Sequence, residues 1–578
     1  MHINDEIWHY IFSYFEYPMP PNGWHKDHDW DEDRWRRQPT LLALCLVNHQ
    51  FRRVAQNLLY RSILIESDSI LGKGDRSPYV RLLKTLADKP ILAGKIRALR
   101  LSKAETEFDK IHKIRAALQN LTLEWSLVGR LRRRLNRSGA ASLLLAHAPQ
   151  VELVECEIAN CKSGIPWMLS GILGLEDKVD FHNEIRRIDD RFAFLVEEAK
   201  LFFNSDPRNM NTQLTGRLRN KSVNYNPLQN LREVRIMAKD VKEAFLPAWS
   251  IEPLLLNPNL RTLRTRGVDW YMDEKEMFVW PTHQSNLECL DLQQTILDAS
   301  ALKKIMTRCP KLKSLFIDLA DLYTKRDDSV PDDNLFRGGR SHYGSDSDDE
   351  EQYVDSSFSD PDARHGDPVC DVDANLTDIS NVLREHGGNI EELAFCTFLY
   401  EQDWIYYSWG GIGSLRELTK LRYLKIEHRK LLGCQDDDLY DNHSMNSSAP
   451  SLKYKRFSDV LPASIETLYI YNIDVHPGAS YNIDEAETIN ALAKAFLAEA
   501  ETWAPNLQKV VVEWWQSTWK WEDFCERDWS RETVDDGWDI KFIEAPFEHE
   551  LPEEHHKMIH VILTKKERGA MREGHAIE

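Results

Sequence analysis

The chain has 578 residues, 42% of them hydrophobic, and a formal charge of −20, so it is long enough to form several domains or one repeat array. The negative charge excludes general affinity for nucleic acid phosphates and for anionic membranes, because both need a basic surface. No apolar run reaches the roughly 18 residues that cross a bilayer, and nine cysteines without a Cys-x-x-Cys pair favour reduced thiols in the cytoplasm or nucleus over a zinc site.

The first predicted element is a helix over residues 5–15, for which Asn4 is the expected N-cap. The segment Met1–Tyr17 contains no Lys or Arg, so we do not expect it to act as a secretory or transit signal. Apolar side chains cover more than half of the helix circumference, with Ile7, Ile11 and Phe15 in one stripe and Trp8 and Phe12 beside it.

Two further short helices are predicted within residues 41–63, LLALCLVNHQFRRVAQNLLYRSI. Thr40 is the expected N-cap of a helix that begins at Leu41, and Asn48 is the expected N-cap of a helix from Gln50 to Gln56. Three helices of about ten residues cannot each bury a wide apolar face within so small a bundle. Part of this apolar surface is therefore expected to bind a partner protein.

The two blocks INDEIWHYIFSYF (residues 3–15) and LLALCLVNHQFRRVAQNLLYRSI resemble the F-box, the helical module that docks onto the Skp adaptor of cullin-based ubiquitin ligases. INDEI corresponds to the family's opening Leu-Pro-x-Glu-Ile, an Ile-Phe pair follows, and Leu-x-x-Val with a later aromatic residue corresponds to the second half. Asn4 replaces the family's proline, and residues 16–40 form a long insertion similar to loops in some F-box proteins of filamentous fungi. The resemblance implies adaptor contacts, some of them shared with packing of the bundle, at Ile3, Ile7, Ile11, Phe12, Phe15, Leu44, Val47 and Phe51.

A triplet of apolar residues with the spacing i, i+3, i+5 recurs along the rest of the chain. Pro or Asn often precedes it, as in NPNLRTL, CPKLKSL and APNLQKV. Between residues 231 and 312 the triplets start 29, 27 and 25 residues apart, within the range of leucine-rich repeats. The triplets begin at Ile96, Val151, Leu231, Leu260, Leu287, Leu312, Ile390, Leu421, Ile465 and Leu507, and the copy at Leu260 is weaker because its third place is Thr265.

The segment QQTILDASALKKIMTRCPK, after the triplet at Leu287, contains a short amphipathic helix, so strand, turn and helix alternate. It resembles the leucine-rich-repeat class of F-box proteins, with Thr295 in the family's Asn or Cys position. Within the strand, Cys289 and Asp291 are expected to point outward. The residues expected to point into one hydrophobic column are Leu287, Leu290, Leu292 and Leu297, with Leu260 and Leu312 of the neighbouring turns.

The expected fold class is α/β, with an N-terminal three-helix F-box (residues 1–63) followed by an irregular leucine-rich-repeat-like solenoid. The solenoid is expected in two parts, residues 64–319 and residues 376–578, the second with a C-terminal cap. Residues 320–375, rich in Asp, Ser, Gly and Pro, are expected to form a disordered acidic insertion between them. The alternative fold is a set of unrelated αβ units with ordinary buried strands.

Three further features allow more than one interpretation. RLRRRLNR (residues 130–137) is a nuclear import signal, a patch for an acidic partner or a solvated helix face. Aromatic clusters at residues 404–409 and 511–524 fill either a core or an interface. Ser345 and Ser347 each precede an acidic residue by three positions and suit acidophilic kinases, although a solubilising loop is the simpler interpretation.

Enzyme motifs are missing. EHELPEEHHKMIH (residues 548–560) lacks the His-Glu-x-x-His spacing and indicates a surface histidine cluster, and GKGD (residues 72–75) lacks the spacing of a phosphate loop. The resemblance therefore implies a non-catalytic substrate receptor, without cofactor or metal, that binds the Skp adaptor, through it a cullin, and an unknown target protein. The alternatives are a repeat scaffold or adaptor-binding protein outside any ligase, and an unrecognised hydrolase, which would need a pocket with convergent His and carboxylates.

Overall fold

The structure, a computed structural model, describes two compact units. The first draws its residues from Met1–Ile296, Arg308–Lys311 and Ala320–Val372, and the second from Leu297–Thr307, Leu312–Leu319 and Asp373–Glu578. The described residues are 4–16, 39–65, 78–101, 144–145, 148, 150–158, 230–238, 246–248, 251, 254–255, 257, 259–270, 284–319, 325–326, 339–340, 376–397, 411–433, 455–475, 480–516, 537–545 and 557–566.

The first unit begins with three helices, α1 (Asp5–Ser13), residues 39–47 and α3 (His49–Leu59). Two predicted caps are confirmed, because the side chain of Asn4 accepts a hydrogen bond from the backbone of Glu6 and that of Asn48 accepts one from the backbone of Phe51. The predicted bounds were less accurate. α1 stops at Ser13, and α3 is longer at both ends than predicted.

The middle helix corrects one predicted cap. Pro39 and Thr40 already lie inside this helix, so Thr40 is not its N-cap. Proline is well tolerated in the first helical turn, where its missing N–H would have no intrahelical partner. The helix therefore starts before the residue at which the apolar pattern begins.

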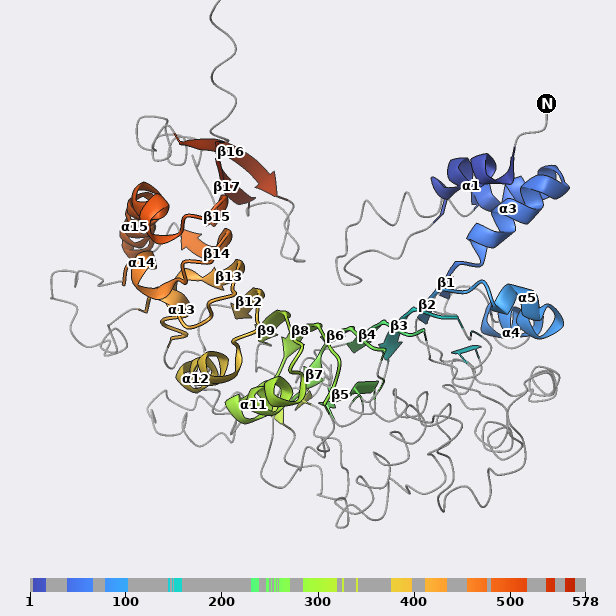
Figure 1. Cartoon of the computed structure of the whole chain (residues 1–578), viewed down its shortest axis with the longest axis horizontal. Helices are drawn as coiled ribbons and strands as arrows, with labels where there is room; N and C mark the ends of the chain where they lie inside the picture. The colour runs from blue at the N-terminus through green and yellow to red at the C-terminus, as the bar shows by residue number, and fades with distance from the viewer. Residues whose placement is uncertain are drawn as a thin grey trace, which may run out of the picture. The chain divides into compact units, whose positions relative to one another are not determined.

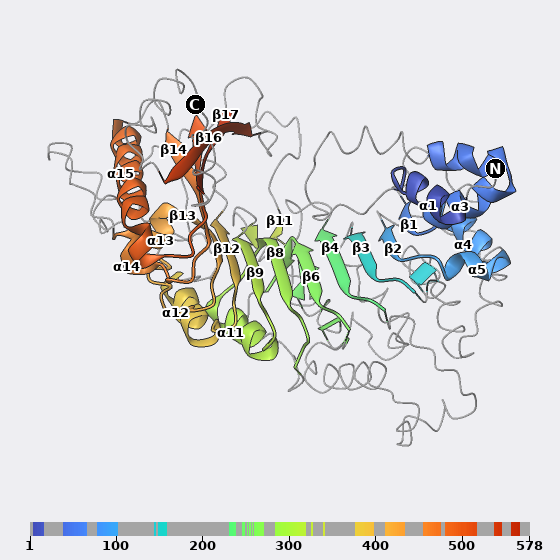
Figure 2. The same ribbon diagram turned by 45° about the horizontal axis from the view of Figure 1, so that its top comes forward.

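Thirteen described strands form one mostly parallel sheet, which confirms the α/β class. In the first unit the strand order follows the sequence, β1-β2-β3-β4-β6-β8, and all neighbouring strands are parallel (Figure 2). Their bounds, with two helices, are β1 (Ser62–Ile65), α4 (Pro78–Asp88), α5 (Pro90–Ala93), β2 (Ala98–Leu101), β3 (Leu153–Ile158), β4 (Glu233–Ala238), β6 (Thr262–Arg266) and β8 (Cys289–Thr295).

Two short strand pairs complete the first unit. β5 (Leu246–Pro247) pairs in parallel with β7 (Val268–Asp269), and β10 (Lys325–Arg326) pairs antiparallel with β11 (Gly339–Arg340). The β10–β11 pair lies inside residues 320–375, so the prediction of an unstructured insertion is wrong for these four residues. The rest of that insertion lies outside the described residues.

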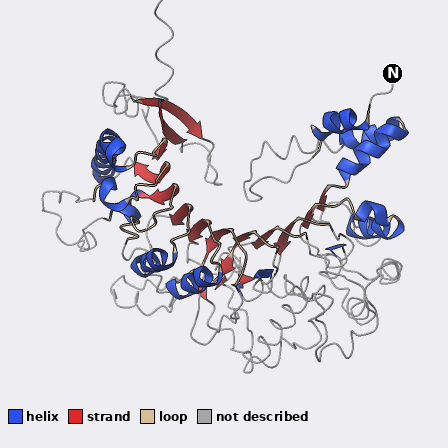
Figure 3. Ribbon diagram, in the orientation of Figure 1, coloured by secondary structure: helices blue, strands red, loops and turns tan. Residues whose placement is uncertain are grey.

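The second unit has the strand order β9-β12-β13-β14-β15-β17-β16. The first five strands are parallel, and the last two pair antiparallel, β17 with β15 and β16 with β17. The helices lie along one side of the strands (Figures 1 and 3). The elements are α11 (Ala299–Arg308), β9 (Ser314–Leu319), α12 (Leu376–His386), β12 (Glu392–Thr397), β13 (Tyr423–Glu427), α13 (His428–Leu432), α14 (Phe457–Val460), β14 (Thr467–Val475), α15 (Ser480–Trp503), β15 (Lys509–Gln516), β16 (Trp538–Ala545) and β17 (Lys557–Lys565).

The apolar triplets of the sequence coincide with parallel strands, and their members lie in register. In the first unit the central residues of successive triplets are Cα partners across the sheet, in the order Leu99, Val154, Val234, Leu263 and Leu290. In the second unit the corresponding row is Leu315, Leu393, Leu424, Leu468 and Val510. All ten side chains are buried, so each row contributes a continuous apolar strip to the core.

The side chains around β8 test the predicted orientation directly. The leucines expected to point into the core are all buried, which confirms the register of the strand. Cys289 is half-buried, but Asp291 is only 5% exposed, so its predicted exposure is wrong. The alternation of side chains between the two faces of the strand was predicted correctly. The face that holds Asp291, which was expected to be exposed, is also buried at this residue.

One glycine fixes the end of a helix in the second unit. The N–H of Gly387, directly after α12, donates to the carbonyl of Leu383 at 2.7 Å. A Cβ at this position would collide with that same carbonyl oxygen and lie 2.9 Å from a methyl carbon of Leu418. At Gly388 a Cβ would meet nothing within 4 Å. Gly387 therefore permits the close approach that ends α12.

Candidate docking surface

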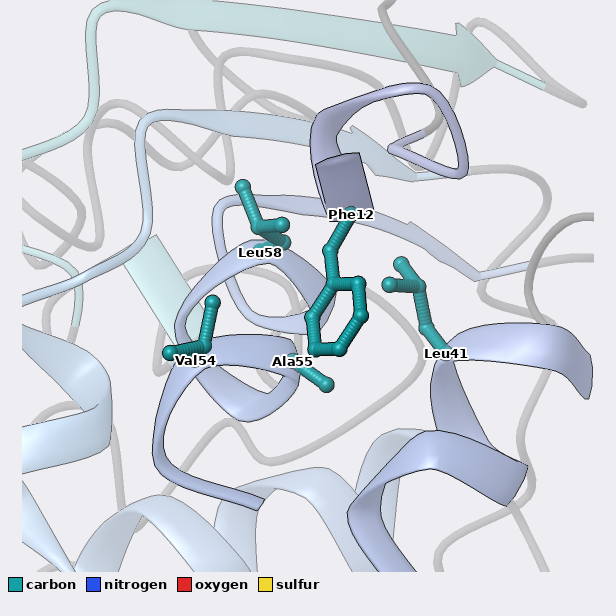
Figure 4. Packing of buried hydrophobic residues seen from close by; sticks show 5 residues of the cluster. All are labelled: Phe12, Leu41, Val54, Ala55 and Leu58. Carbon is teal, nitrogen blue, oxygen red and sulfur yellow. The ribbon is translucent and has the colours of Figure 1, made fainter. Parts of the chain in front are cut away.

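The three N-terminal helices share a small core. The Phe12 side chain of α1 lies among Leu41, Val54, Ala55 and Leu58 (Figure 4). All five side chains are at most 3% exposed. The partly buried side chains packed against this core are Trp8, Phe15, Leu44, Cys45, Phe51 and Leu59.

Aromatic and polar contacts fix α1 against α3. The Phe51 ring lies 4.4 Å from the Trp8 ring and 5.1 Å from the Phe12 ring, measured between centroids. The Nε2 of Gln50 donates to Oδ1 of Asp5 at 2.9 Å, and Arg53 forms an ion pair with the same carboxylate. The orientation of α1 is thereby set, and with it the direction in which its opposite face points.

That opposite face of α1 is apolar and exposed. Ile7, Tyr10, Ile11 and Tyr14 follow the spacing i, i+3, i+4, i+7, which places them in one stripe. Ile7 is 52% exposed, and Tyr10 and Tyr14 are 65% and 66% exposed. α1 therefore has two apolar faces, of which the core covers one.

The middle helix has the same property. Leu41, Leu44 and Cys45 face the core, whereas Leu42, Leu46 and Val47 are exposed, Leu46 by 80%. A helix that is apolar around its whole circumference is normally buried on all sides. We call the exposed apolar residues of these two helices the docking surface, which comprises Ile7, Tyr10, Ile11, Tyr14, Leu42, Leu46 and Val47.

The structure sorts the residues for which the sequence suggested adaptor contacts. Ile7, Ile11 and Val47 belong to the docking surface. Phe12 is a central core residue with 2% exposure, so an outward role for it must be corrected. Phe15, Leu44 and Phe51 pack against the core from its edge, and Ile3 lies outside the described residues.

Four members of the docking surface were not predicted, namely Tyr10, Tyr14, Leu42 and Leu46. The two tyrosines could have been predicted from the sequence, because each follows Ile7 or Ile11 by three residues and so lies on the same helical stripe. Leu42 and Leu46 are also four residues apart. Their spacing alone did not distinguish them from the core stripe beside them.

A charged row lies on the sheet of the first unit, on the face opposite to the apolar rows. Its members are Cα partners in the order Arg100, Glu155, Arg235, Arg264 and Asp291. Nε of Arg100 lies 2.8 Å from Glu155, and Nη1 of Arg235 lies 3.5 Å from the same carboxylate. Glu155 and Arg235 are buried.

Glu233, on the same strand as Arg235, continues the ion pairs. Its Oε1 lies 2.7 Å from Nε of Arg235 and 3.1 Å from Nε of Arg264, whose Nη1 lies 3.1 Å from Asp291. Burial alone would lower the pKa of Arg264, but the nearby Asp291, Cys289 and Glu233 outweigh burial and raise it. The charged side chains of this row and Glu233 therefore form ion pairs with one another.

A polar cluster occupies the corresponding face of the second unit. The Tyr469 hydroxyl donates to Oε2 of Glu513 at 2.5 Å and lies 3.0 Å from Nε2 of His560, and the Lys425 ammonium lies 4.8 Å from the Tyr469 ring centroid. Burial by itself would raise the pKa of Glu513. The hydrogen bonds from His560 and Tyr469 and the charge of Lys425 outweigh burial and lower it.

This polar cluster corrects one interpretation of the sequence. His560 was expected in a surface histidine cluster, but it lies on β17 as the Cα partner of Glu513 and is half-buried. Likewise Val511, from the C-terminal aromatic segment, is a buried residue of β15. Residues 72–75, 130–137, 404–409 and 548–556, with Ser345 and Ser347, lie outside the described residues.

Within the described ranges, no group of three or more His, Cys, Asp or Glu is placed to hold a metal ion. In the same part of the chain no helix is both long and apolar enough to cross a membrane. Burial raises the pKa of Cys309 and Cys396 to about 12, which keeps these two thiols protonated and weakly nucleophilic.

Comparison with known proteins adds no family. A scan against protein-family models finds no match for the chain, and a search of curated proteins finds none either. The docking surface is therefore the strongest indication of function in the described part of the chain.

Proposed function

We propose that the chain is a substrate-receptor subunit of a Skp–cullin–F-box ubiquitin ligase. The observation that carries this proposal is the docking surface, where two helices keep an apolar face exposed although each already packs a core with its other face. The same segments carry the resemblance to the F-box. In such a complex the docking surface binds the Skp adaptor, and the adaptor bridges to the cullin.

The proposed mechanism is positioning and requires no catalytic residue of this chain. The adaptor would hold the receptor on the cullin, and the receptor would hold a target protein. A target lysine would then stay close to the activated ubiquitin, which raises its effective concentration.

We also propose that the two sheet portions are parts of an irregular leucine-rich-repeat solenoid that binds the target. The registered apolar rows support this, because each triplet returns to the equivalent place on the next parallel strand. Thr295 supports it as well. Its buried hydroxyl donates to the carbonyl of Val268 at 2.7 Å, which joins two backbone segments 27 residues apart.

The test of adaptor docking replaces Ile11, which is 39% exposed on the docking surface, by Asp. A charge in an apolar contact should cost at least ~2–3 kcal/mol of binding to a recombinant Skp adaptor, about a hundredfold. Ile91→Asp is the matched control, because Ile91 is an exposed isoleucine on α5, away from the docking surface. Binding should be measured by titration calorimetry, with helicity checked by circular dichroism.

Full binding by a well-folded Ile11→Asp variant would show that the docking assignment is wrong. A second function, a scaffold that binds the adaptor outside any ligase, predicts the same loss for Ile11→Asp. The two functions differ in whether a cullin co-purifies with the full-length chain. A receptor should bring down the cullin through the adaptor, and a scaffold should bring down the adaptor alone.

A further inference from the structure

We infer that the paired hydroxyls of Tyr10 and Tyr14 determine the specificity of the docking surface by binding one oxygen acceptor of the adaptor, a carbonyl or a carboxylate. The inference rests on the proposed function and deepens it. It assigns one directional hydrogen bond to a surface that is otherwise apolar. The adaptor must therefore present an oxygen acceptor at that place.

The two tyrosines form a defined pair at the C-terminal end of α1, where Tyr14 is the C-cap. Their ring centroids are 5.7 Å apart with an interplanar angle of 87°, an edge-to-face arrangement. Their hydroxyl oxygens lie 3.2 Å apart, within hydrogen-bonding distance. Because both side chains are about two-thirds exposed, the pair is formed before any partner arrives.

The hydrogen-bonding capacity of the pair is limited. Each hydroxyl can donate one hydrogen bond, and one of the two donates to the other. One O–H therefore remains, and because both side chains are exposed it is open to solvent in the unbound protein. The hydroxyl that already accepts a hydrogen bond is also the better donor, because hydrogen bonds in a chain polarise one another.

Docking of an apolar surface would exclude solvent from this O–H. An outward O–H facing a methyl group would then lose its hydrogen bond, which disfavours any partner without an acceptor at that place. The hydrogen bond with Tyr10, followed by slight burial, raises the pKa of Tyr14 above its ordinary value of 10.0. The Tyr14 hydroxyl thus stays protonated throughout the neutral range and can donate a hydrogen bond.

The experiment measures binding of the full-length chain to a recombinant Skp adaptor for Tyr10→Phe, Tyr14→Phe and the double variant. Phenylalanine keeps the ring and its apolar area and removes only the hydroxyl. Tyr60→Phe is the matched control, since Tyr60 is the half-buried C-cap of α3 and does not belong to the docking surface. Thermal unfolding should be unchanged in all variants.

The expected result is a loss of affinity that is not additive. The double variant should bind about 2- to 10-fold more weakly if the acceptor is a carbonyl, and more than 10-fold if it is a carboxylate, because a charged acceptor forms the stronger hydrogen bond. A carboxylate acceptor is confirmed if Asp→Asn and Glu→Gln changes in the adaptor reduce the difference between parent and double variant to the 2- to 10-fold expected of a neutral acceptor. A carbonyl acceptor leaves that difference intact.

The inference and the proposed function fail differently. Unchanged affinity of the double variant, together with loss of binding in Ile11→Asp, would overturn the role of the hydroxyl pair and leave adaptor docking in place. Additive losses of affinity in the double variant would also overturn the inference, because the two hydroxyls would then contact the adaptor independently. No binding by the parent chain would overturn the proposed function itself.

Discussion

Leu290 and Asp291 are neighbours on β8 that point to opposite faces of the sheet, and both are buried. Leu290→Ala should lower the free energy of unfolding by ~2–5 kcal/mol, as truncation of a buried leucine does. Asp291→Ala should lower the free energy of unfolding by about 1–3 kcal/mol. The change removes one of the two carboxylates that pair with the partly buried Arg264. Urea unfolding of both variants measures the two costs.

Glu288→Ala is the control for the loss of a carboxylate, since Glu288 is half exposed and pairs with Arg261, which is also half exposed. This control should stay within about 0.5 kcal/mol of the parent. If Asp291→Ala is as mild as the control, the charged row contributes little to stability. Sequence periodicity alone assigned Asp291 to the surface, because alternation distinguishes the two faces of a strand but does not indicate whether the second face is covered.

Among the elements, α12 offers a test at a single backbone position. Gly387→Ala should lower the free energy of unfolding by roughly 1–3 kcal/mol, because the new methyl group would displace the Leu383 carbonyl that receives the Gly387 N–H. Gly388→Ala, one residue along, has open space and should change stability little. Thermal and urea unfolding compare the two. Equal effects would mean that α12 ends for another reason.

The polar cluster that links β14, β15 and β17 predicts a dependence on pH. Because the pKa of Glu513 is lowered in the folded chain, its contribution to stability is complete above the ordinary value of 4.5 and is lost as the pH falls through the lower, folded value. The stability difference between the parent and Glu513→Gln should therefore be largest near neutral pH and shrink below about 4.5. Glu499→Gln, at an exposed position of α15, should show no such trend. Urea unfolding between pH 3 and 7 measures the stability of the parent and of both variants. A difference between parent and Glu513→Gln that does not change with pH would contradict the predicted role of Glu513.

At the scale of the whole molecule, the sequence predicted the parallel strands well. Each apolar triplet marked a strand, because a residue buried in a parallel sheet has few alternatives to Leu, Ile or Val. β16 and β17 were not among the predicted triplets, although Met558, Val561 and Leu563 of β17 have the same spacing, and both strands pair antiparallel at one end of the sheet order. The three N-terminal helices were also predicted, with two of their caps. Which apolar face of α1 would be exposed was not predictable, because Ile7 and Phe12 satisfy helical periodicity equally well.

The charged row has a consequence for how this protein can diverge. Each of its charges touches charges on neighbouring strands, so a single change at Arg235 or Glu155 leaves the other of these two buried charges with one ion pair in place of two. Lineages that lose one partner should therefore also lose or exchange the other, and substitutions at these positions should be inherited in pairs. Covariation among relatives would show the row as a linked set that crosses five strands, whereas the apolar rows should accept Leu, Ile and Val one position at a time.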